Sequence, residues 1–322
     1  METIDGFINI ENNLKRQIEE ECQRIGVLCR VFSRSKDIQS LKKKIEKKEK
    51  EFREKHPEKT SECYYSPEGK KVQDIIGIRI VTYFYEDVEL LWDFFGEKYD
   101  VIDTNNPNTK NNEFGVVTKN MVCKLPEEEK NTFNETQNSF YNQQDLFGKL
   151  DSTFEIQFRT ILSEGWHEIE HDLRYKNKDD WDYLDEDSRT LNGIYATLET
   201  SERAMKALFN DVAHKHYKKH NWGAMLRSKF RMHLRKYDLS ESLNELIERN
   251  ATTIGRSLFK FDRNELIDII AKSGLHISLT IDNIVFIINY IDIQDSDITK
   301  QMPENIRLDI ENNLKSFIHK DQ

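Results

Sequence analysis

The chain has 322 residues, enough for one large domain or two ordinary ones, each with its own hydrophobic core. Charged residues make up 33% of it and the formal net charge is −10, so a highly solvated surface is expected. No run of 18 uncharged apolar residues occurs, which argues against a membrane span and a membrane partner. The N-terminal sequence lacks the pattern of a secretion signal, and the four cysteines form no C-x-x-C pair. We therefore expect a cytoplasmic protein with reduced cysteines.

The first half of the chain has the pattern of a mixed α/β domain. Apolar residues at helical spacing predict helices over 5–26, 37–54 and 86–96. Runs of β-branched and aromatic residues predict strands over 27–33, 74–84, 98–103, 114–125 and 152–160. The stretch DIIGIRIVTYF (74–84) is nearly continuously apolar, so we expect it to lie centrally in a sheet, covered on both faces. Asp37 is placed to cap a helix, and residues 127–149 are expected to form a polar insertion.

The second half of the chain is expected to be helical. Helical spacing is found over 161–173, 186–220, 239–250 and 263–274. The stretch SLTIDNIVFIINYIDI (278–293) is ambiguous between helix and strand. We therefore divide the chain into a mixed α/β domain (1–184), a long basic helical segment (185–236) and a helical C-terminal region of unassigned role (237–322).

The string WHEIEH contains His167, Glu168 and His171 in the pattern H-E-x-x-H, which is the zinc-peptidase signature. Glu170 places a charge immediately before the second histidine, where zinc peptidases typically have an uncharged residue. No third ligand is apparent among the many acidic residues. A peptidase would also leave the polar residues of the preceding strand without a role, so we favour a different chemistry.

Three stretches associated with strands carry polar residues that a protein core would not select. RSKDIQSLKKK leaves a strand and enters a helix, and basic side chains at a helix start form a phosphate-binding arrangement. Its candidate residues are Arg34, Lys36, Ser40 and Lys44. Asp74, at the start of a buried strand, suits Mg²⁺, which takes one or two carboxylates plus substrate phosphates. Glu155 and Gln157 point to one face of another strand, and the set as a whole suits phosphoryl-group transfer.

This arrangement resembles the alarmone synthetase domain of the RelA/SpoT family. RSKDIQSLKKKI resembles the family's R-x-K…S…K segment, and DIIGIRIV resembles its D-x-x-G-x-R strand. FEIQFRT…WHEIEHDLRYK resembles the E-x-Q-x-R-T…H…YK segment, and the matches follow family order over roughly residues 25–180. The resemblance implies an α+β, nucleotidyltransferase-like mixed β-sheet flanked by helices and followed by a helical C-terminal region. It also implies the synthetase type that has no HD hydrolase domain, because few residues precede the region.

The resemblance further implies a reaction and a role for each matching residue. The β,γ-pyrophosphate of ATP would move to the 3′-hydroxyl of an acceptor nucleotide, with Mg²⁺ as cofactor. The implied ATP-binding residues are Arg34, Lys36, Ser40, Lys44 and Arg79, the last on the adenine side. Asp74 and Glu155 would bind Mg²⁺, and Glu155 would also activate the acceptor hydroxyl as general base. The implied acceptor-binding residues are Lys110, Thr118, Asn120, Gln157, Arg159, His171 and Lys176.

One loop departs from the family pattern. The family's acceptor loop ends in G-Y-x-S-x-H, in which Tyr stacks on guanine and His helps to hold the acceptor. The corresponding stretch FGVVTKNMV keeps Gly115 but has Val116, Thr118 and Asn120 at the positions of Tyr, Ser and His. Valine cannot supply base stacking, which contributes about 1–3 kcal/mol per base. Asparagine cannot be protonated, so the acceptor is left open.

Three functions follow from this pattern. The first is synthesis of (p)ppGpp from GDP or GTP with a rebuilt acceptor pocket. The second is the same transfer to an adenine nucleotide or to the 3′ end of tRNA, for which the basic stretch 201–236 offers a polyanion-binding surface. A solvated helix face is the simpler interpretation of that stretch. The third is a nucleotide-binding regulator with little catalysis, and a homo-oligomer is compatible with all three.

Overall fold

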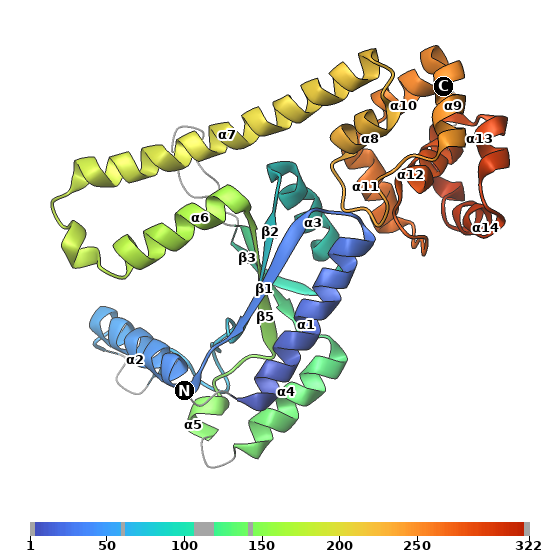
Figure 1. Cartoon of the computed structure of the whole chain (residues 1–322). Helices are drawn as coiled ribbons and strands as arrows, with labels where there is room; N and C mark the ends of the chain where they lie inside the picture. The colour runs from blue at the N-terminus through green and yellow to red at the C-terminus, as the bar shows by residue number, and fades with distance from the viewer. Residues whose placement is uncertain (1–3, 59–61, 106–118, 141–143, 319–322) are drawn as a thin grey trace. The chain divides into compact units, whose positions relative to one another are not determined.

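The computed structural model describes residues 4–58, 62–105, 119–140 and 144–318. By compactness the chain divides into two units, drawn in Figure 1. The sheet unit comprises Met1–Glu19, Arg30–Val81 and Leu91–His167, and the helical unit comprises Glu20–Cys29, Thr82–Leu90 and Glu168–Gln322. Compactness thus places the main division at residue 167. The sequence-based limits of 1–184, 185–236 and 237–322 stay predictions.

A five-stranded sheet of order β1-β2-β5-β4-β3 forms the sheet unit. Its strands are β1 (Cys29–Ser35), β2 (Ile76–Thr82), β3 (Val101–Asn105), β4 (Lys119–Lys124) and β5 (Thr153–Thr160). Strand β4 pairs antiparallel with both β3 and β5. Contacts along β2 and β5 advance in the same direction, from the parallel bridge of Val72 with Leu150 to the hydrogen bond of Arg79 with Gln157. The sheet is therefore mixed, as predicted.

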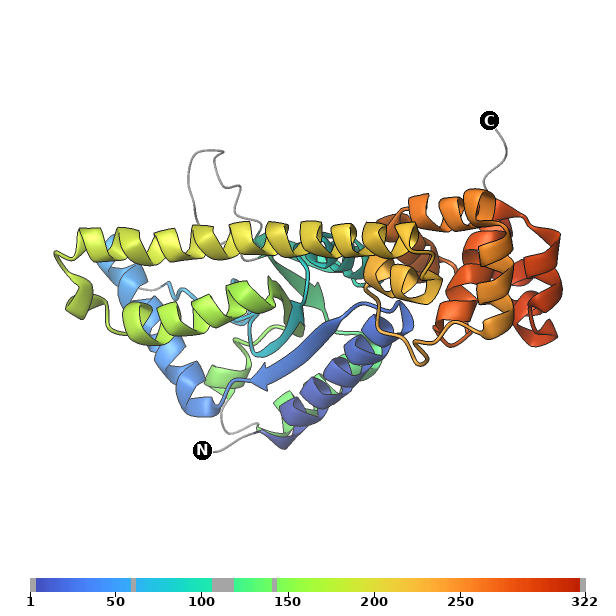
Figure 2. The ribbon, with the colours of Figure 1, turned by 45° about the horizontal axis from the view of Figure 1, so that its top comes forward.

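Helices α1 (Asp5–Arg24) and α4 (Glu127–Ser139) lie side by side along the sheet, as the two views in Figures 1 and 2 show. The Phe7 and Phe133 rings stack with centroids 5.2 Å apart, and Gln17 Nε2 donates to Glu129 Oε1 at 2.8 Å. Phe133 and Phe147 are fully buried, the latter in the short helix α5 (Gln144–Phe147). The prediction of a polar insertion over 127–149 is therefore wrong, because widely spaced phenylalanines anchor this polar segment to the core.

The remaining elements of the sheet unit follow the predictions with small shifts. Helix α2 (Ile38–Lys55) begins after Asp37, whose side chain accepts from Ser40 N. Helix α3 (Tyr85–Lys98) is longer than predicted, so β3 begins only at Val101. Strand β2 is interior, but β5 takes the centre, and Gly77 and Arg79 are only half-buried. The expectation that β2 is central and covered on both faces is thus wrong, because one of its faces carries polar groups.

The helical unit is built from helices connected by short loops. Its elements are the last turn of α6 (Ile161–Glu170), a π-helix (His171–Tyr175), α7 (Asp185–Lys218), α8 (Trp222–Phe230), α9 (Glu241–Arg249), α10 (Arg256–Lys260), α11 (Arg263–Lys272), α12 (Ile281–Ile288), α13 (Ser296–Gln301) and α14 (Glu304–Asn313). The ambiguous stretch 278–293 is helical: α12 is capped by Thr280 and buried along its whole length, which removes the amphipathic signal. Among the described residues no helix is long and apolar enough to cross a membrane.

Candidate active site

One face of the sheet is polar because the side chains of β5 alternate. Phe154, Ile156 and Phe158 are fully buried, whereas the alternate positions carry Glu155, Gln157 and Arg159. The neighbouring strands place Asn120 opposite Gln157 and Val122 opposite Glu155 in the β4–β5 ladder. Paired residues share a face, so polar groups from several strands meet there.

A continuous chain of polar contacts crosses this face. Gln157 Nε2 donates to Glu155 Oε2 at 2.8 Å, and Gln157 Oε1 accepts from Arg79 Nε at 3.2 Å. Arg79 also pairs with Glu164 of α6 through Nη1. The second oxygen of Glu164 accepts from Arg159 Nη1 at 2.9 Å. The predicted residues Glu155, Gln157, Arg79 and Arg159 therefore lie together, joined by a glutamate that the motifs did not identify.

A second cluster brings the predicted phosphate-binding lysines onto the predicted metal ligand. Lys36 and Lys44 both contact Asp74 Oδ2, the latter at 2.5 Å. Burial raises the pKa of Asp74, but the two ammonium groups outweigh it and hold the pKa below its usual value. For Lys36 the balance is reversed: burial lowers its pKa more than Asp74 raises it. These three residues, from three separate segments of the chain, form one charged site.

The residues here fit a magnesium ion. Asp74 Oδ1 is buried and has no hydrogen-bond partner in the described part of the chain, so an oxygen is available for a ligand. Glu155, a half-buried carboxylate of strand β5, is the second predicted ligand. Mg²⁺ is typically held by one or two carboxylates plus substrate phosphates, which matches this donor set.

The other predicted ATP-binding residues occupy more open positions. Arg34 is exposed, and its side chain lies where a Cβ added at Gly77 would meet it at van der Waals distance. Ser40 is also exposed, and its hydroxyl donates to Asp37 Oδ2 at 2.8 Å while its N–H donates to Asp37 Oδ1 at 2.9 Å. Ser40 therefore contributes to the cap of α2 in this structure, and its role at a phosphate stays a prediction.

The predicted acceptor residues are placed unevenly. Lys110 and Thr118, with Val116, lie outside the described residues. Asn120 is described, and its Oδ1 is buried without a hydrogen-bond partner in the described ranges. His171 and Lys176 belong to the helical unit, where both contact Asp172, at 3.0 and 2.7 Å. Their roles at an acceptor stay predictions.

Two further residues of the sheet unit were not identified from the sequence. Glu164 lies five residues after Arg159, in the first turns of the helix that follows β5, and this junction was the available signal. Lys119 is buried in β4 with its ammonium group 5.5 Å from the centre of the Trp92 ring. It lies next to the stretch that differs from the family's acceptor-loop motif. In this loop the sequence predicts a functional lysine only at Lys110.

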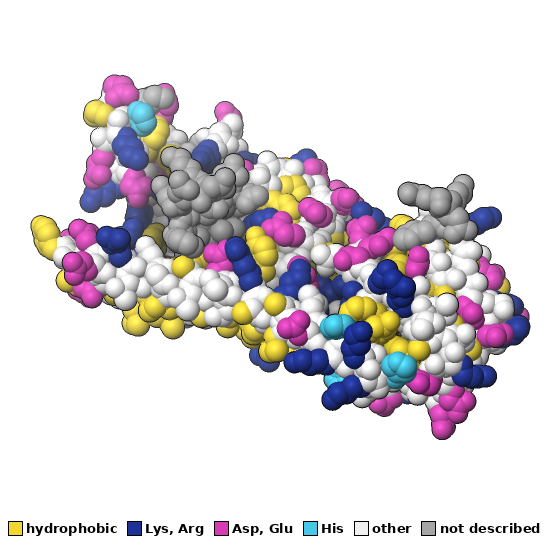
Figure 3. Space-filling model, turned by 90° about the horizontal axis from the view of Figure 1, so that it is seen from above, with side chains coloured by type: hydrophobic (Ala, Val, Ile, Leu, Met, Phe, Trp, Pro, Cys, Tyr) yellow, Lys and Arg dark blue, Asp and Glu magenta, His cyan; other side chains and the backbone are white. Residues whose placement is uncertain are grey.

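The basic stretch 201–236 is partly neutralised by neighbouring acids. Lys206 and Arg231 both contact Glu86, and Arg203 pairs with Glu199 at 2.6 Å. On the face drawn in Figure 3, lysine, arginine and histidine side chains gather on the helical unit. The H-E-x-x-H string gives no metal cluster, since no three histidine, cysteine or acidic side chains gather to hold a metal within the described ranges.

Comparison with known proteins finds one family model that matches part of the chain. The family model described as "Region found in RelA / SpoT proteins" matches residues 33–180. GTP pyrophosphokinase YjbM of Bacillus subtilis is 27% identical over 111 residues, which are 34% of this chain and 45% of that relative. Among solved structures, a GTP pyrophosphokinase family protein from Streptococcus pneumoniae is 21% identical, covering 65% of this chain and 92% of that chain with a TM-score of 0.45. Small alarmone synthetase 1 from Bacillus subtilis is 19% identical, covering 65% and 95% with a TM-score of 0.43. Residues 33–180 of this chain, a little under half of it, thus match the region found in RelA/SpoT proteins.

Proposed function

We propose that the chain is a nucleotide pyrophosphokinase that transfers the β,γ-pyrophosphate of ATP to the 3′-hydroxyl of GDP or GTP, giving (p)ppGpp. The observation that carries the proposal is the pairing of two different sites around strands β1, β2 and β5. One is a lysine–aspartate cluster suited to phosphates and a metal ion, and the other is a carboxylate, Glu155, oriented by Gln157. The names of the relatives, GTP pyrophosphokinase and small alarmone synthetase, support the same reaction class.

The transfer requires a base, phosphate contacts and charge neutralisation. The acceptor 3′-oxygen forms a bond to the β-phosphorus of ATP, the bond from that phosphorus to the α,β-bridging oxygen breaks, and AMP leaves. Glu155 takes the hydroxyl proton in this scheme, since it is the carboxylate of the polar face. Lys36 and Lys44 bind the phosphates, and Asp74 and Glu155 would hold Mg²⁺. When bound, the metal ion would neutralise the negative charge of the transferring group.

Glu164 acts in this scheme as a positioning residue. Its side chain is only 16% exposed, and its two oxygens contact Arg79 and Arg159 separately. Arg79 in turn contacts Gln157, which contacts Glu155. A guanidinium group can bind a phosphate or a carboxylate with the same fork geometry. Glu164 therefore holds both arginine side chains at the edge of the site before substrates bind. Its contribution is geometric, and it contacts no reacting atom.

The acceptor is the least determined part of the proposal. Asn120 lies opposite Gln157 and has a buried oxygen with no hydrogen-bond partner in the described residues. A buried acceptor atom of this kind is costly unless a ligand or water donates to it, so Asn120 is suited to a donor group of an acceptor nucleotide. Guanine has such donors, and so do adenine nucleotides and the terminal adenosine of tRNA. The same transfer to one of these acceptors is the alternative.

An acceptor panel tests the proposal. The purified protein is incubated with ATP labelled in the γ-phosphate and, separately, with GDP, GTP, ADP, AMP and bulk tRNA, and the products are resolved. Label on GDP or GTP supports (p)ppGpp synthesis. If label is found only on an adenine nucleotide or only on tRNA, that molecule is the acceptor instead of GDP or GTP. ATP binding without transfer to any acceptor contradicts the proposed enzymatic activity and favours a nucleotide-binding regulator.

A further inference from the structure

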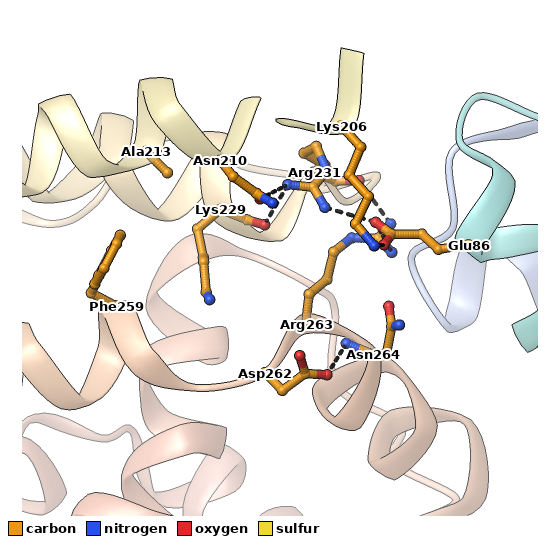
Figure 4. A pocket seen from close by; sticks show the side chains of 10 residues that line it. All are labelled: Glu86, Lys206, Asn210, Ala213, Lys229, Arg231, Phe259, Asp262, Arg263 and Asn264. Carbon is orange, nitrogen blue, oxygen red and sulfur yellow. Dashed lines mark hydrogen bonds and ion pairs between the residues drawn. The ribbon is translucent and has the colours of Figure 1, made fainter. Parts of the chain in front are cut away.

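The helical unit contains a polar pocket that lies outside the proposed active site. Its volume is about 150 Å³, and Figure 4 shows it between α7, α8, α10 and α11. The lining residues that the argument uses are Glu86, Lys206, Asn210, Lys229, Arg231 and Phe259. All of them belong to the helical unit, so the pocket is formed within one compact part of the chain.

On one side of the pocket, acidic and basic side chains form a network of ion pairs. Glu86 contacts Lys206, Arg231 at 2.7 Å and Arg263 at 3.3 Å. Arg263 also pairs with the fully buried Asp87 at 2.6 Å. These carboxylates satisfy much of the positive charge on this side, and Figure 4 shows the contacts of Glu86 with Lys206 and Arg231 at one end of the pocket.

The other side carries two positive side chains with donor groups that are not used in this network. Lys229 is half-buried, and no carboxylate of the described residues lies within ion-pair distance of its ammonium group. Its Nζ lies 5.6 Å from the centre of the Phe259 ring, and burial lowers its pKa. The Arg231 side chain is 5% exposed, and its Nε is buried without a hydrogen-bond partner in the described part of the chain. Buried donors without partners are uncommon in native proteins and indicate a missing ligand or water.

The hydrogen-bonding groups on this side of the pocket indicate the chemical class of its ligand. The unused groups of Lys229 and Arg231 are N–H donors, and the Asn210 Oδ1 is already occupied by Arg231 at 3.0 Å, which leaves its NH₂ group as a further donor. Asp262 also lines the pocket: its Oδ1 accepts from Asn264 N and Glu265 N as the cap of α11, and its charge raises the pKa of Lys229 against the larger effect of burial. A lysine beside an arginine, with four basic side chains against two acidic ones in the lining, suits a phosphate oxyanion.

The size of the pocket limits the ligand further. A cavity of about 150 Å³ accommodates a molecule the size of benzene, whereas sites for drug-sized ligands have volumes of about 300–1,000 Å³. We propose that this pocket binds a small phosphate oxyanion, free or as the end group of a small phosphoester, between Lys229 and Arg231. A nucleotide is too large to be enclosed there. The site is separate from the proposed transfer reaction and does not depend on it.

Phosphate binding tests the proposal in a background without the active-site lysines. The full chain carrying Lys36→Met and Lys44→Met is titrated calorimetrically with inorganic phosphate and, in a second arm, with glycerol 3-phosphate, at constant ionic strength. Lys229→Met is then added, with Lys218→Met as the control because Lys218 is an exposed lysine of α7. Circular dichroism confirms that each variant retains its helices.

The expected result is saturable binding in the background variant that Lys229→Met weakens roughly tenfold or more, as loss of a charge-assisted hydrogen bond requires. Lys218→Met should leave the affinity unchanged. Binding of inorganic phosphate alone would identify a free-anion site, and binding of both probes would identify a phosphate end-group site. The proposal is overturned if neither probe binds the folded background variant, or if Lys229→Met binds as that background does.

Discussion

Glu164 lies between Arg79 and Arg159, and each of its carboxylate oxygens contacts one of these arginines. The motifs indicate the arginines but not this glutamate: the strand–helix junction places Glu164 close to Arg159, but its pairing with both arginines depends on how α6 leaves β5. Asp74, Lys36 and Lys44 were all chosen from the sequence, yet their mutual contact required the folded structure. Residue type and order therefore predict a set of candidate groups, while the contacts among these groups are visible only in the three-dimensional structure.

Replacing Glu164 by Gln tests its positioning role. The amide keeps the shape of the side chain but loses the charge that holds both arginines, so kcat/KM for pyrophosphate transfer should fall on the order of 10²-fold, as for a small misplacement of binding groups. Steady-state kinetics measure the changes in kcat and in KM. These changes should occur without a matching loss of stability. Glu135→Gln on the exposed face of α4 is the control. Unchanged kinetics in Glu164→Gln contradict the assignment.

Asp74→Asn tests the charged cluster through pH. Asp74 has a lowered pKa in the folded protein, so its ionised form stabilises the fold fully above the ordinary aspartate value of about 3.9. That contribution is lost as pH falls through the lower, folded-state pKa. Wild type should therefore lose more unfolding free energy than Asp74→Asn between pH 6 and the acid range, as denaturant titrations measure. Parallel loss in both proteins would refute the interpretation.

Helix α4 illustrates what sequence patterns miss at the scale of elements. Its segment reads as polar because most of its residues face solvent, and a few phenylalanines make the contact with α1. The stretch 278–293 stays ambiguous from its sequence, because a buried helix has no polar face and its apolar run resembles that of a strand. Strongly periodic elements such as α1 and α2 were predicted well, because their amphipathic pattern reflects burial on one face only.

The contact of α4 with α1 should contribute to the stability of the sheet unit. Phe133→Ala removes a buried ring stacked on Phe7 and should cost about 3–5 kcal/mol of unfolding free energy. Glu135→Ala, on the exposed face of the same helix, should change it by less than about 0.5 kcal/mol. Chemical denaturation followed by circular dichroism compares the two. Equal, small effects would show that the segment is a loosely attached insertion after all.

The molecule combines a sheet unit, which holds most of residues 33–180, with a helical unit that holds a buried ion network. Sequence order predicted the α+β half and the helical half, but compactness divides the chain at residue 167 and draws two earlier segments into the helical unit. Those segments include Glu86 and Asp87, whose partners Arg231 and Arg263 are distant in sequence. Long-range ion pairs of this kind leave no local pattern.

Asp87→Ala tests how far the helical unit depends on that network. The change leaves Arg263, at 5% exposure, with only its longer contact to Glu86 at 3.3 Å, and breaking a buried pair costs about 3–5 kcal/mol. Asp268→Ala removes the partner of Lys272 in a half-exposed pair and should cost at most about 1 kcal/mol. Thermal unfolding followed separately for each unit is the measurement, because two units need not unfold in one step. A small effect of Asp87→Ala would contradict the assigned role.

Pyrophosphate transfer by wild type and Glu155→Gln tests the central claim most directly. Both proteins are given labelled ATP with GDP or GTP, and ATP binding is measured in parallel on the same preparations. The account predicts labelled (p)ppGpp from wild type. It predicts a loss of at least about 10²-fold in Glu155→Gln with ATP binding retained, because the general base is missing. Full transfer by Glu155→Gln would contradict it.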